Sequence, residues 1–150
     1  MSESFHILFI DDDPIALSLA GRALASERHC ISCAATADEA LAMLAGMNFD
    51  LVIVDIIMPG MDGFEFLTHM RRRPEFDDIP ALAVSVRNDG ATAERALACG
   101  AQSFHSKPLD WTLLTEQIHE VLAGRSALNC PTNGDISVAV EELVDAIPVW

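Results

Sequence analysis

Short apolar segments alternate with segments of helical periodicity along the first 124 residues, and this alternation constrains the fold more than any other feature. The clearest apolar segment is Leu51–Val54, a largely β-branched run of the kind found in parallel strands covered on both faces. We expect the other strands at residues 5–10, 29–35, 81–86 and 103–106, and helices that begin near residues 14, 37, 64, 91 and 110. Five consecutive strand–helix units predict an α/β fold, an open five-stranded parallel sheet with helices on both faces.

Composition and charge exclude several classes of protein. The chain has 150 residues, of which 51% are hydrophobic, so it can build a substantial core and is not a disordered chain. With 9 Lys and Arg against 23 Asp and Glu, the formal net charge is -14, which argues against binding to nucleic acid. The basic cluster at residues 71–73 is typical of the last turn of a helix, where positive charge is favoured.

The sequence shows no targeting or membrane-spanning signal. No apolar run approaches the ~20 residues that a bilayer helix needs. The first residues have neither the basic flank nor the apolar core of a signal peptide. We therefore expect a cytoplasmic protein without membrane contacts.

The predicted strand–helix units end near Gly124, so we expect one domain over residues 1–124 and a C-terminal extension over residues 125–150. In the extension, a turn-rich linker is followed by a short amphipathic helix, whose apolar residues are Ile136, Val140, Leu143, Val144 and Ile147. Because so short a helix needs a surface to pack on, we expect it to dock on its own domain, on a second copy as a homodimer, or on a downstream partner. Whether the chain is a stand-alone protein or the front piece of a longer one is left open.

Polar side chains stand at the carboxyl ends of four predicted strands, the edge where open parallel sheets bind their ligands. They are Asp11 and Asp12, Asp55, Ser85 and Lys107. Carboxylates that meet there repel one another, which implies a divalent cation, and Mg²⁺ suits carboxylates combined with a backbone carbonyl and a phosphate oxygen. Lys107 is the one lysine of the chain, and a compact ammonium suits a single phosphoryl oxygen. Each residue alone could be a turn or cap residue, but four strand ends would then need four independent explanations.

These residues resemble those of the receiver domain of two-component response regulators, over about residues 5–124 in order and spacing. The resemblance rests on Ile-Asp-Asp-Asp-Pro at 10–14, Val-Asp-Ile-Ile-Met-Pro-Gly-Met-Asp-Gly at 54–63, Ser85 after Ala-Leu-Ala-Val, Ser-Lys-Pro-Leu at 106–109, and Phe104 three residues before the lysine. It implies the flavodoxin-like, doubly wound receiver fold. It also implies a phosphoacceptor signalling domain rather than an enzyme, with self-catalysed phosphotransfer and slow autodephosphorylation as its only reactions.

The resemblance also assigns roles to individual residues. Asp55 is the expected phosphoacceptor, which takes a phosphoryl group from a phosphohistidine to form an acyl phosphate. Mg²⁺ (or Mn²⁺) is expected on Asp12, Asp55 and the backbone carbonyl of Ile57, with Asp11 in support through a water molecule.

Two further groups are expected on the phosphoryl oxygens, Lys107 and the Ser85 hydroxyl, and Ser85 and Phe104 are the expected switch residues. A cis peptide bond before Pro108 is also implied. The implied partners are a sensor histidine kinase or a histidine phosphotransfer protein, and a protein target downstream.

The phosphorylated state is expected to be comparatively long-lived. Ile57 and Arg87 lie two residues beyond Asp55 and Ser85, where they obstruct the in-line approach of water, and neither supplies a base. Val86 is larger than the residue usual after the switch hydroxyl, which narrows the approach further.

Three other functions fit parts of the sequence. Asp11 and Asp13 also resemble the motif of haloacid-dehalogenase-like phosphohydrolases, in which Asp11 would be the nucleophile and Asp13 the acid/base. Against this, Ile15 stands where that family usually has Thr or Val, and the chain has no room for a substrate-selecting cap. A flavin-binding module of similar topology would need a Ser/Thr/Gly-rich phosphate loop after the first strand, and no such loop follows residues 5–10 here. A phosphorylation-independent pseudo-receiver interaction module would not need the full set of site residues, so the presence of that set in this sequence disfavours it.

Overall fold

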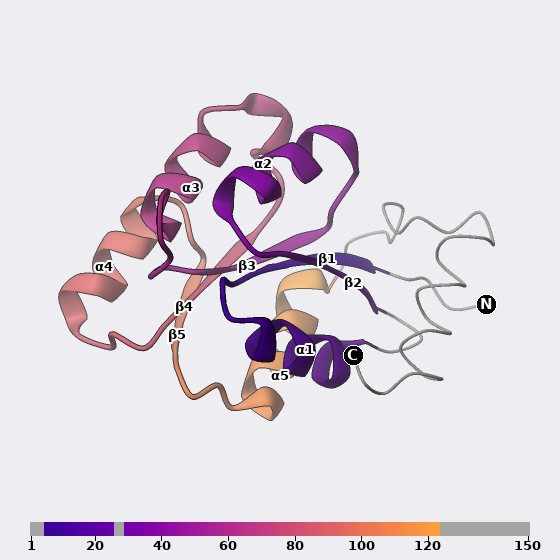
Figure 1. Cartoon of the computed structure of the whole chain (residues 1–150), viewed down its shortest axis with the longest axis vertical. Helices are drawn as coiled ribbons and strands as arrows, with labels where there is room; N and C mark the ends of the chain where they lie inside the picture. Colours follow the sequence, from indigo (N-terminus) through magenta and orange to yellow (C-terminus); the bar gives the residue numbers. More distant parts are fainter. Residues whose placement is uncertain (1–4, 26–28, 124–150) are drawn as a thin grey trace.

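The computed structural model describes residues 5–25 and 29–123, and the expected alternation of strands and helices runs through them (Figure 1). The strands are β1 (Phe5–Ile10), β2 (His29–Ala34), β3 (Leu51–Asp55), β4 (Ala81–Ser85) and β5 (Ser103–Ser106). The helices are α1 (Pro14–Leu24), α2 (Ala37–Gly46), α3 (Gly63–Arg71), α4 (Gly90–Ala98) and α5 (Trp111–Leu122). A short 3-10 helix, η1 (Pro74–Phe76), precedes β4 and is not among the predicted elements.

Each helix from α1 to α5 begins after a polar side chain that accepts a hydrogen bond from a backbone N–H of the first turn. These caps are Asp13, Thr36, Asp62, Asp89 and Asp110. At α2, Thr36 accepts the Glu39 N–H at 3.0 Å, and Glu39 accepts the N–H of Ala35, the residue before the cap, at 2.7 Å. The complete capping box is at α3, where the Asp62 side chain accepts the Glu65 N–H and the Glu65 side chain accepts the Asp62 N–H. Strand β2 ends at Ala34, one residue earlier than predicted.

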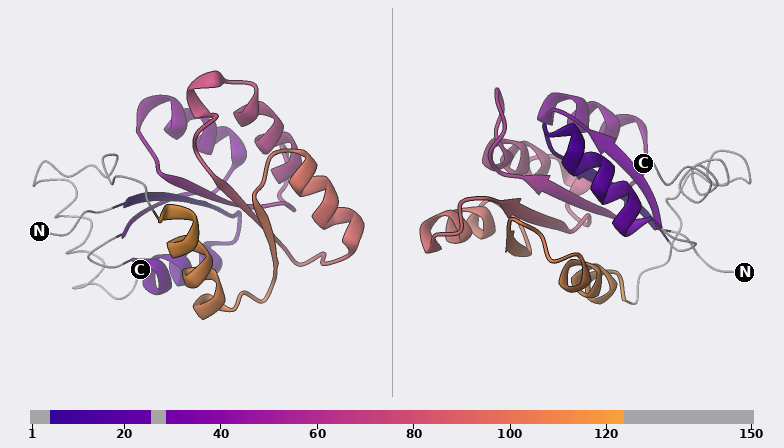
Figure 2. Two further views of the ribbon diagram at one scale, coloured as in Figure 1. Left: turned by 180° about the vertical axis from the view of Figure 1, so that it is seen from behind. Right: turned by 60° about the horizontal axis from the view of Figure 1, so that its bottom comes forward.

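All strands are parallel, in the order β2-β1-β3-β4-β5. Helices α1 and α5 cover one face of the sheet, and α2, α3 and α4 cover the other (Figure 2). This is the predicted five-stranded α/β fold. The chain leaves β1 and β3 in opposite directions along the sheet, so their carboxyl ends form the switch point at which open α/β sheets bind ligands.

The sheet separates two hydrophobic cores, because successive strand residues point to opposite faces. The core under α1 and α5 contains Ile7, Phe9, Leu51, Ile53, Leu82 and Val84. The core under α2, α3 and α4 contains Leu8, Ile10, Val52, Val54, Ala81 and Ala83. At the carboxyl ends of the strands, buried polar residues take over from these apolar ones.

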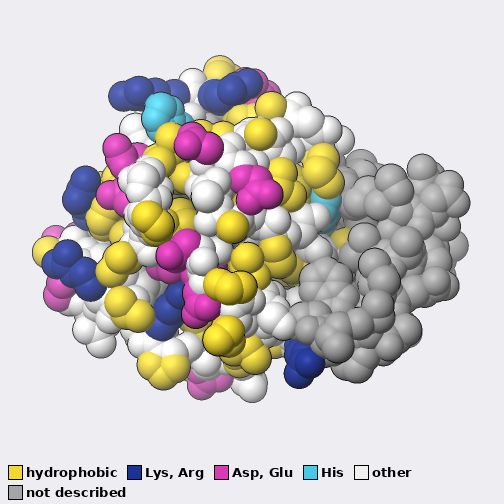
Figure 3. Space-filling model, viewed as in Figure 1, with side chains coloured by type: hydrophobic (Ala, Val, Ile, Leu, Met, Phe, Trp, Pro, Cys, Tyr) yellow, Lys and Arg dark blue, Asp and Glu magenta, His cyan; other side chains and the backbone are white. Residues whose placement is uncertain are grey.

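Two arginines of the basic cluster at residues 71–73 make contacts within the domain. The Arg71 guanidinium donates to the carbonyl oxygens of Gly100 and Phe76, each at 3.0 Å, and Arg73 forms an ion pair with Glu75 at 3.1 Å. On the face of the molecule drawn in Figure 3, basic side chains are separated by acidic and apolar ones. That face therefore carries no continuous basic surface among the described residues.

Within the described part of the chain, no helix combines the length and apolar character needed to cross a membrane. The predicted amphipathic helix of the C-terminal extension, residues 125–150, lies outside the described residues.

Candidate functional site

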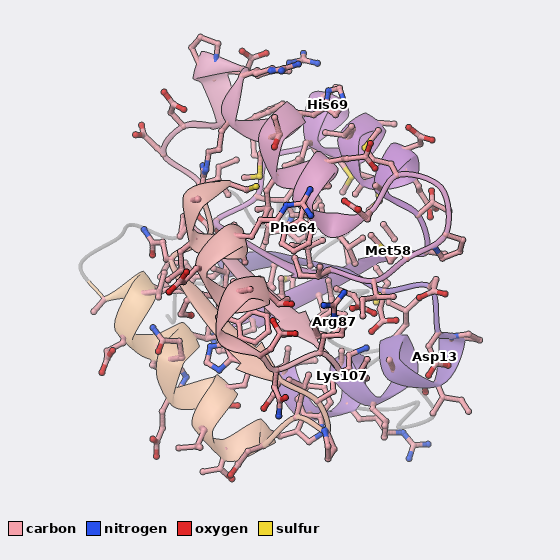
Figure 4. The ribbon with its side chains drawn as sticks, turned by 90° about the vertical axis from the view of Figure 1, so that its left-hand side faces the viewer. Asp13, Met58, Phe64, His69, Arg87 and Lys107 are labelled. Carbon is pink, nitrogen blue, oxygen red and sulfur yellow. The ribbon has the colours of Figure 1, made fainter. Side chains whose placement is uncertain are left out.

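The polar residues predicted at four strand ends meet at one edge of the sheet. Figure 4 labels Lys107 among them. Asp55 ends β3 and Ser85 ends β4, while Asp11 and Lys107 directly follow β1 and β5. The parallel ladder continues past the last strand pair, because the Lys107 N–H donates to the Ser85 carbonyl at 2.8 Å. The fold therefore brings together side chains that are up to 96 positions apart in the sequence.

The Lys107 ammonium bridges two buried carboxylates. Its Nζ lies 2.5 Å from Oδ2 of Asp11 and 3.1 Å from Oδ2 of Asp55. The exposed fractions of the side chains are 0% for Asp11, 7% for Asp55 and 19% for Lys107. The second oxygens also have partners, since Oδ1 of Asp11 accepts the Asp13 N–H at 2.9 Å and Oδ1 of Asp55 accepts the Ile57 N–H at 3.1 Å. Both buried carboxylates are thus oriented by hydrogen bonds at each oxygen.

Burial and repulsion between the carboxylates set the ionisation of this cluster. Burial, and then the charge of Asp11, raise the pKa of Asp55 from 3.8 to about 6, although hydrogen bonds from Lys107 and the Ile57 N–H oppose this rise. Burial disfavours the charged form of Lys107, but its contacts with Asp11 and Asp55 outweigh burial and hold the pKa of Lys107 above its usual value. The cluster therefore holds more negative charge than Lys107 alone neutralises.

Asp12 completes an acidic cluster that could hold a metal ion. One carboxylate oxygen from each of Asp11, Asp12 and Asp55 lies within 4.8 Å of the others, and Asp12 is exposed to solvent. A hard divalent cation, which prefers several oxygen ligands, fits this donor set. The carbonyl of Ile57 stays a predicted ligand.

The two predicted switch residues lie on neighbouring strands. Ser85 is fully buried, and its Oγ accepts the Arg87 N–H at 3.1 Å. Phe104 is partly buried and packs against the core under α2, α3 and α4. The Lys107–Pro108 peptide bond is cis, as the resemblance implies. Ser85 thus belongs to the polar edge, whereas Phe104 belongs to the apolar packing beside it.

Two contacts near the site are not apparent from the sequence. A Cβ on Gly63 would lie 2.6 Å from the carbonyl oxygen of Asp55, so this helix start requires a glycine. The Arg87 guanidinium forms an ion pair with Asp89, the cap of α4, at 3.3 Å. The sequence signal for the first is a glycine directly after a helix cap. The only sequence signal for the Arg87–Asp89 ion pair is an arginine two positions before an aspartate, and this spacing alone does not predict a contact.

Comparison with known proteins settles the family. Residues 7–119 match the model of the response regulator receiver domain. The chain belongs to this family. The receiver is 30% identical over 116 residues to the transcriptional regulatory protein AfsQ1 of Streptomyces coelicolor, covering 77% of this chain and 50% of that protein. It is 34% identical over 107 residues to the transcriptional regulatory protein TcrA of Mycobacterium tuberculosis, covering 70% of this chain and 41% of that protein.

Among solved structures, the receiver is similar to the chemotaxis protein CheY4 of Vibrio cholerae, with a TM-score of 0.75 and 27% identity over 79% of this chain and 99% of that chain. The receiver spans half or less of the length of the two transcriptional regulators. The family match favours a phosphoacceptor receiver over the phosphohydrolase, flavin-binding and pseudo-receiver alternatives. Asp13, the second acid of the phosphohydrolase motif, instead caps α1 by accepting the Ile15 N–H at 2.9 Å.

Proposed function

We propose that Asp55 of this receiver accepts a phosphoryl group from a phosphohistidine of a sensor histidine kinase or a histidine phosphotransfer protein. The observation that carries the proposal is the contact of the Lys107 ammonium with the buried carboxylates of Asp11 and Asp55. Asp55 on β3 lies between Asp11 after β1 and Ser85 on β4, so the other site groups surround it. This central position favours Asp55 over Asp11 as the nucleophile.

In the transfer, an oxygen of the ionised Asp55 carboxylate forms a bond to phosphorus while the bond from phosphorus to the histidine nitrogen breaks. The electron pair of the broken bond stays on the imidazole. The pKa of about 6 leaves Asp55 mostly ionised at neutral pH, as a nucleophile must be. Lys107 and the Ser85 hydroxyl bind phosphoryl oxygens and hold the group in position.

The acidic cluster supports a metal site in the same place. Asp12, Asp55 and the Ile57 carbonyl would hold Mg²⁺ or Mn²⁺, and Asp11 would support the ion through a water molecule. When bound, the cation supplies positive charge that offsets the carboxylates and the incoming phosphoryl oxygens.

Phosphorylation then acts as a conformational switch through Ser85 and Phe104 that a downstream protein target reads. The receiver domain extends over residues 1–124 in this proposal, and residues 125–150 form an extension that packs on it, on a second copy or on a partner. The proposed reactions of the receiver domain are self-catalysed phosphotransfer and slow autodephosphorylation, so the domain is not an enzyme toward other substrates. In this proposal the receiver is cytoplasmic and binds proteins, and the net charge of -14 argues against contacts with nucleic acid or an anionic membrane surface.

The experiment is incubation of the full chain with a small acyl phosphate donor and Mg²⁺, followed by intact-mass analysis. The parent should gain one phosphoryl group, whereas Asp55→Asn, or the parent with a chelator, should gain none. If Asp55→Asn is labelled as well as the parent while Asp11→Asn is not, the phosphohydrolase alternative replaces this proposal.

A further inference from the structure

Arg87 lies at the edge of the site, where the sequence predicts that it obstructs the approach of water, but the phosphotransfer proposed above gives its guanidinium no contact with the phosphoryl group. The backbone N–H of Arg87 donates to Oγ of Ser85 at 3.1 Å. Ser85 is the proposed hydroxyl contact of the phosphoryl group. Figure 4 shows the Arg87 and Lys107 side chains at the same edge of the molecule. The backbone of Arg87 is therefore one hydrogen bond away from a group that would touch the phosphoryl oxygens.

The present partner of the Arg87 guanidinium holds it weakly. Nη2 of Arg87 lies 3.3 Å from Oδ2 of Asp89, and the two side chains are 66% and 47% exposed. Exposed ion pairs of this kind contribute little to stability. The other oxygen of Asp89, Oδ1, caps α4 by accepting the Thr92 N–H at 2.7 Å. Arg87 can therefore leave Asp89 without breaking the cap of α4.

Phosphorylation changes the charge balance at this edge. Before transfer, a bound divalent cation together with Lys107 would neutralise the formal charges of the carboxylates of Asp11, Asp12 and Asp55. The phosphoryl group replaces one carboxylate charge by a group that carries close to two negative charges at neutral pH. One negative charge is then unmatched, next to a guanidinium that is only weakly paired.

We propose that in the phosphorylated receiver the Arg87 guanidinium exchanges the Asp89 carboxylate for the phosphoryl group on Asp55. The planar guanidinium can donate two parallel hydrogen bonds to phosphate oxygens, a geometry that the Lys107 ammonium does not offer. The exchange covers the acyl phosphate against water and releases Asp89 at the start of α4. This inference rests on the proposed function, because it names a further ligand of the same phosphoryl group.

The test is titration of the full chain with beryllofluoride in the presence of Mg²⁺, followed by NMR, with beryllofluoride as a non-covalent stand-in for the phosphoryl group. Arg87→Gln should weaken beryllofluoride binding about fivefold. Asp89→Asn should tighten it about twofold, because Asn still caps the helix but no longer attracts the guanidinium. Arg95→Gln, which removes the same charge on α4 over the Phe64 ring, is the matched control and should leave binding unchanged.

The Nε–H signal of Arg87 gives a second readout and should shift on beryllofluoride addition in the parent, while Mg²⁺ alone binds the parent and Arg87→Gln equally. If Arg87→Gln binds beryllofluoride like the parent, or if Arg95→Gln weakens binding as much, the exchange is refuted and the proposed function stands. Weaker binding by Asp89→Asn also refutes the exchange. If the parent binds no beryllofluoride at all, the proposed function itself fails.

Discussion

Replacing Asp55 by Asn should stabilise the metal-free receiver at neutral pH, although it removes the proposed phosphoacceptor. The Asp55 carboxyl is buried and faces the charge of Asp11, and these two effects raise its pKa to about 6 in spite of Lys107. At neutral pH the Asp55 carboxyl of the folded protein is therefore ionised, although its buried environment favours the protonated, neutral form. Asn has nearly the same shape and is neutral, but its single carbonyl oxygen can accept only one of the two bonds that Lys107 and the Ile57 N–H donate to separate oxygens of Asp55, and this loss offsets part of the gain.

The size of the effect follows from the pKa of Asp55 in the folded and unfolded chain. The rise from 3.8 to about 6 is about 2 pKa units, and each unit corresponds to about 1.4 kcal/mol. Ionised Asp55 therefore destabilises the fold by about 3 kcal/mol above the folded-state pKa. As the pH falls from about 6 toward 3.8, the folded protein takes up the proton before the unfolded chain does, so this penalty disappears. Asp55→Asn should thus raise the free energy of unfolding by about 1–3 kcal/mol at neutral pH and by almost nothing near pH 4.

The assay is urea unfolding of the parent and Asp55→Asn with a chelator present, at neutral pH and near pH 4. Asp62→Asn, which removes one carboxylate at a helix cap outside the cluster, controls for net charge and should not reproduce the pH-dependent gain. Adding Mg²⁺ should stabilise the parent more than Asp55→Asn, because the variant lacks a proposed ligand. The reasoning is refuted if Asp55→Asn is less stable than the metal-free parent at neutral pH, or if the difference does not change with pH.

Three further predictions concern other parts of the chain. Gly63→Ala should lower the free energy of unfolding by about 1–3 kcal/mol in urea, because its Cβ would lie 2.6 Å from main-chain atoms of Asp55 and Ile56, whereas Gly46→Ala, with nothing within 4 Å, should not destabilise. The double variant Ile57→Asn, Arg87→Glu should lose its acyl phosphate faster than the parent in a mass-based decay assay, because water then reaches the phosphoryl group more easily; faster decay of the parent would contradict this. Removal of residues 126–150 should alter thermal stability, oligomer size or amide exchange in the core, and no change in all three would show that the predicted amphipathic helix packs on nothing.

The sequence predicts the elements of this fold well because each has a local signal. Leu51–Val54 is an apolar β-branched run, and helix starts such as those at Asp13 and Thr36 are marked by side chains that cap the first turn. The 3-10 helix at Pro74–Phe76 lacks such a signal, since three residues show no periodicity. The distant partner of Arg71 has no local signal either, because the Gly100 carbonyl reaches it only through the packing of α3 against the loop before β5.

The site residues could be predicted as a set because parallel strands bring their carboxyl ends to one edge. What the sequence does not contain is the pairing within the set. That Lys107 contacts both Asp11 and Asp55, and that Asp55 is buried enough to raise its pKa, depends on side-chain direction and burial. The Arg87–Asp89 pair depends in the same way on how the loop after β4 turns.

The division of the interior by the sheet has a consequence for how this receiver can change over evolution. Ile53 and Val54 are adjacent in the chain, yet they belong to different cores with separate packing partners. The free-energy effects of substitutions in the two cores should therefore be close to additive for side chains that share no partners and lie more than about 7–10 Å apart. Selection can remodel the layer of α1 and α5 while the layer of α2, α3 and α4 stays as it is. The strand ends that carry Asp55 and Lys107 belong to the sheet that both helix layers share, so substitutions there affect both layers.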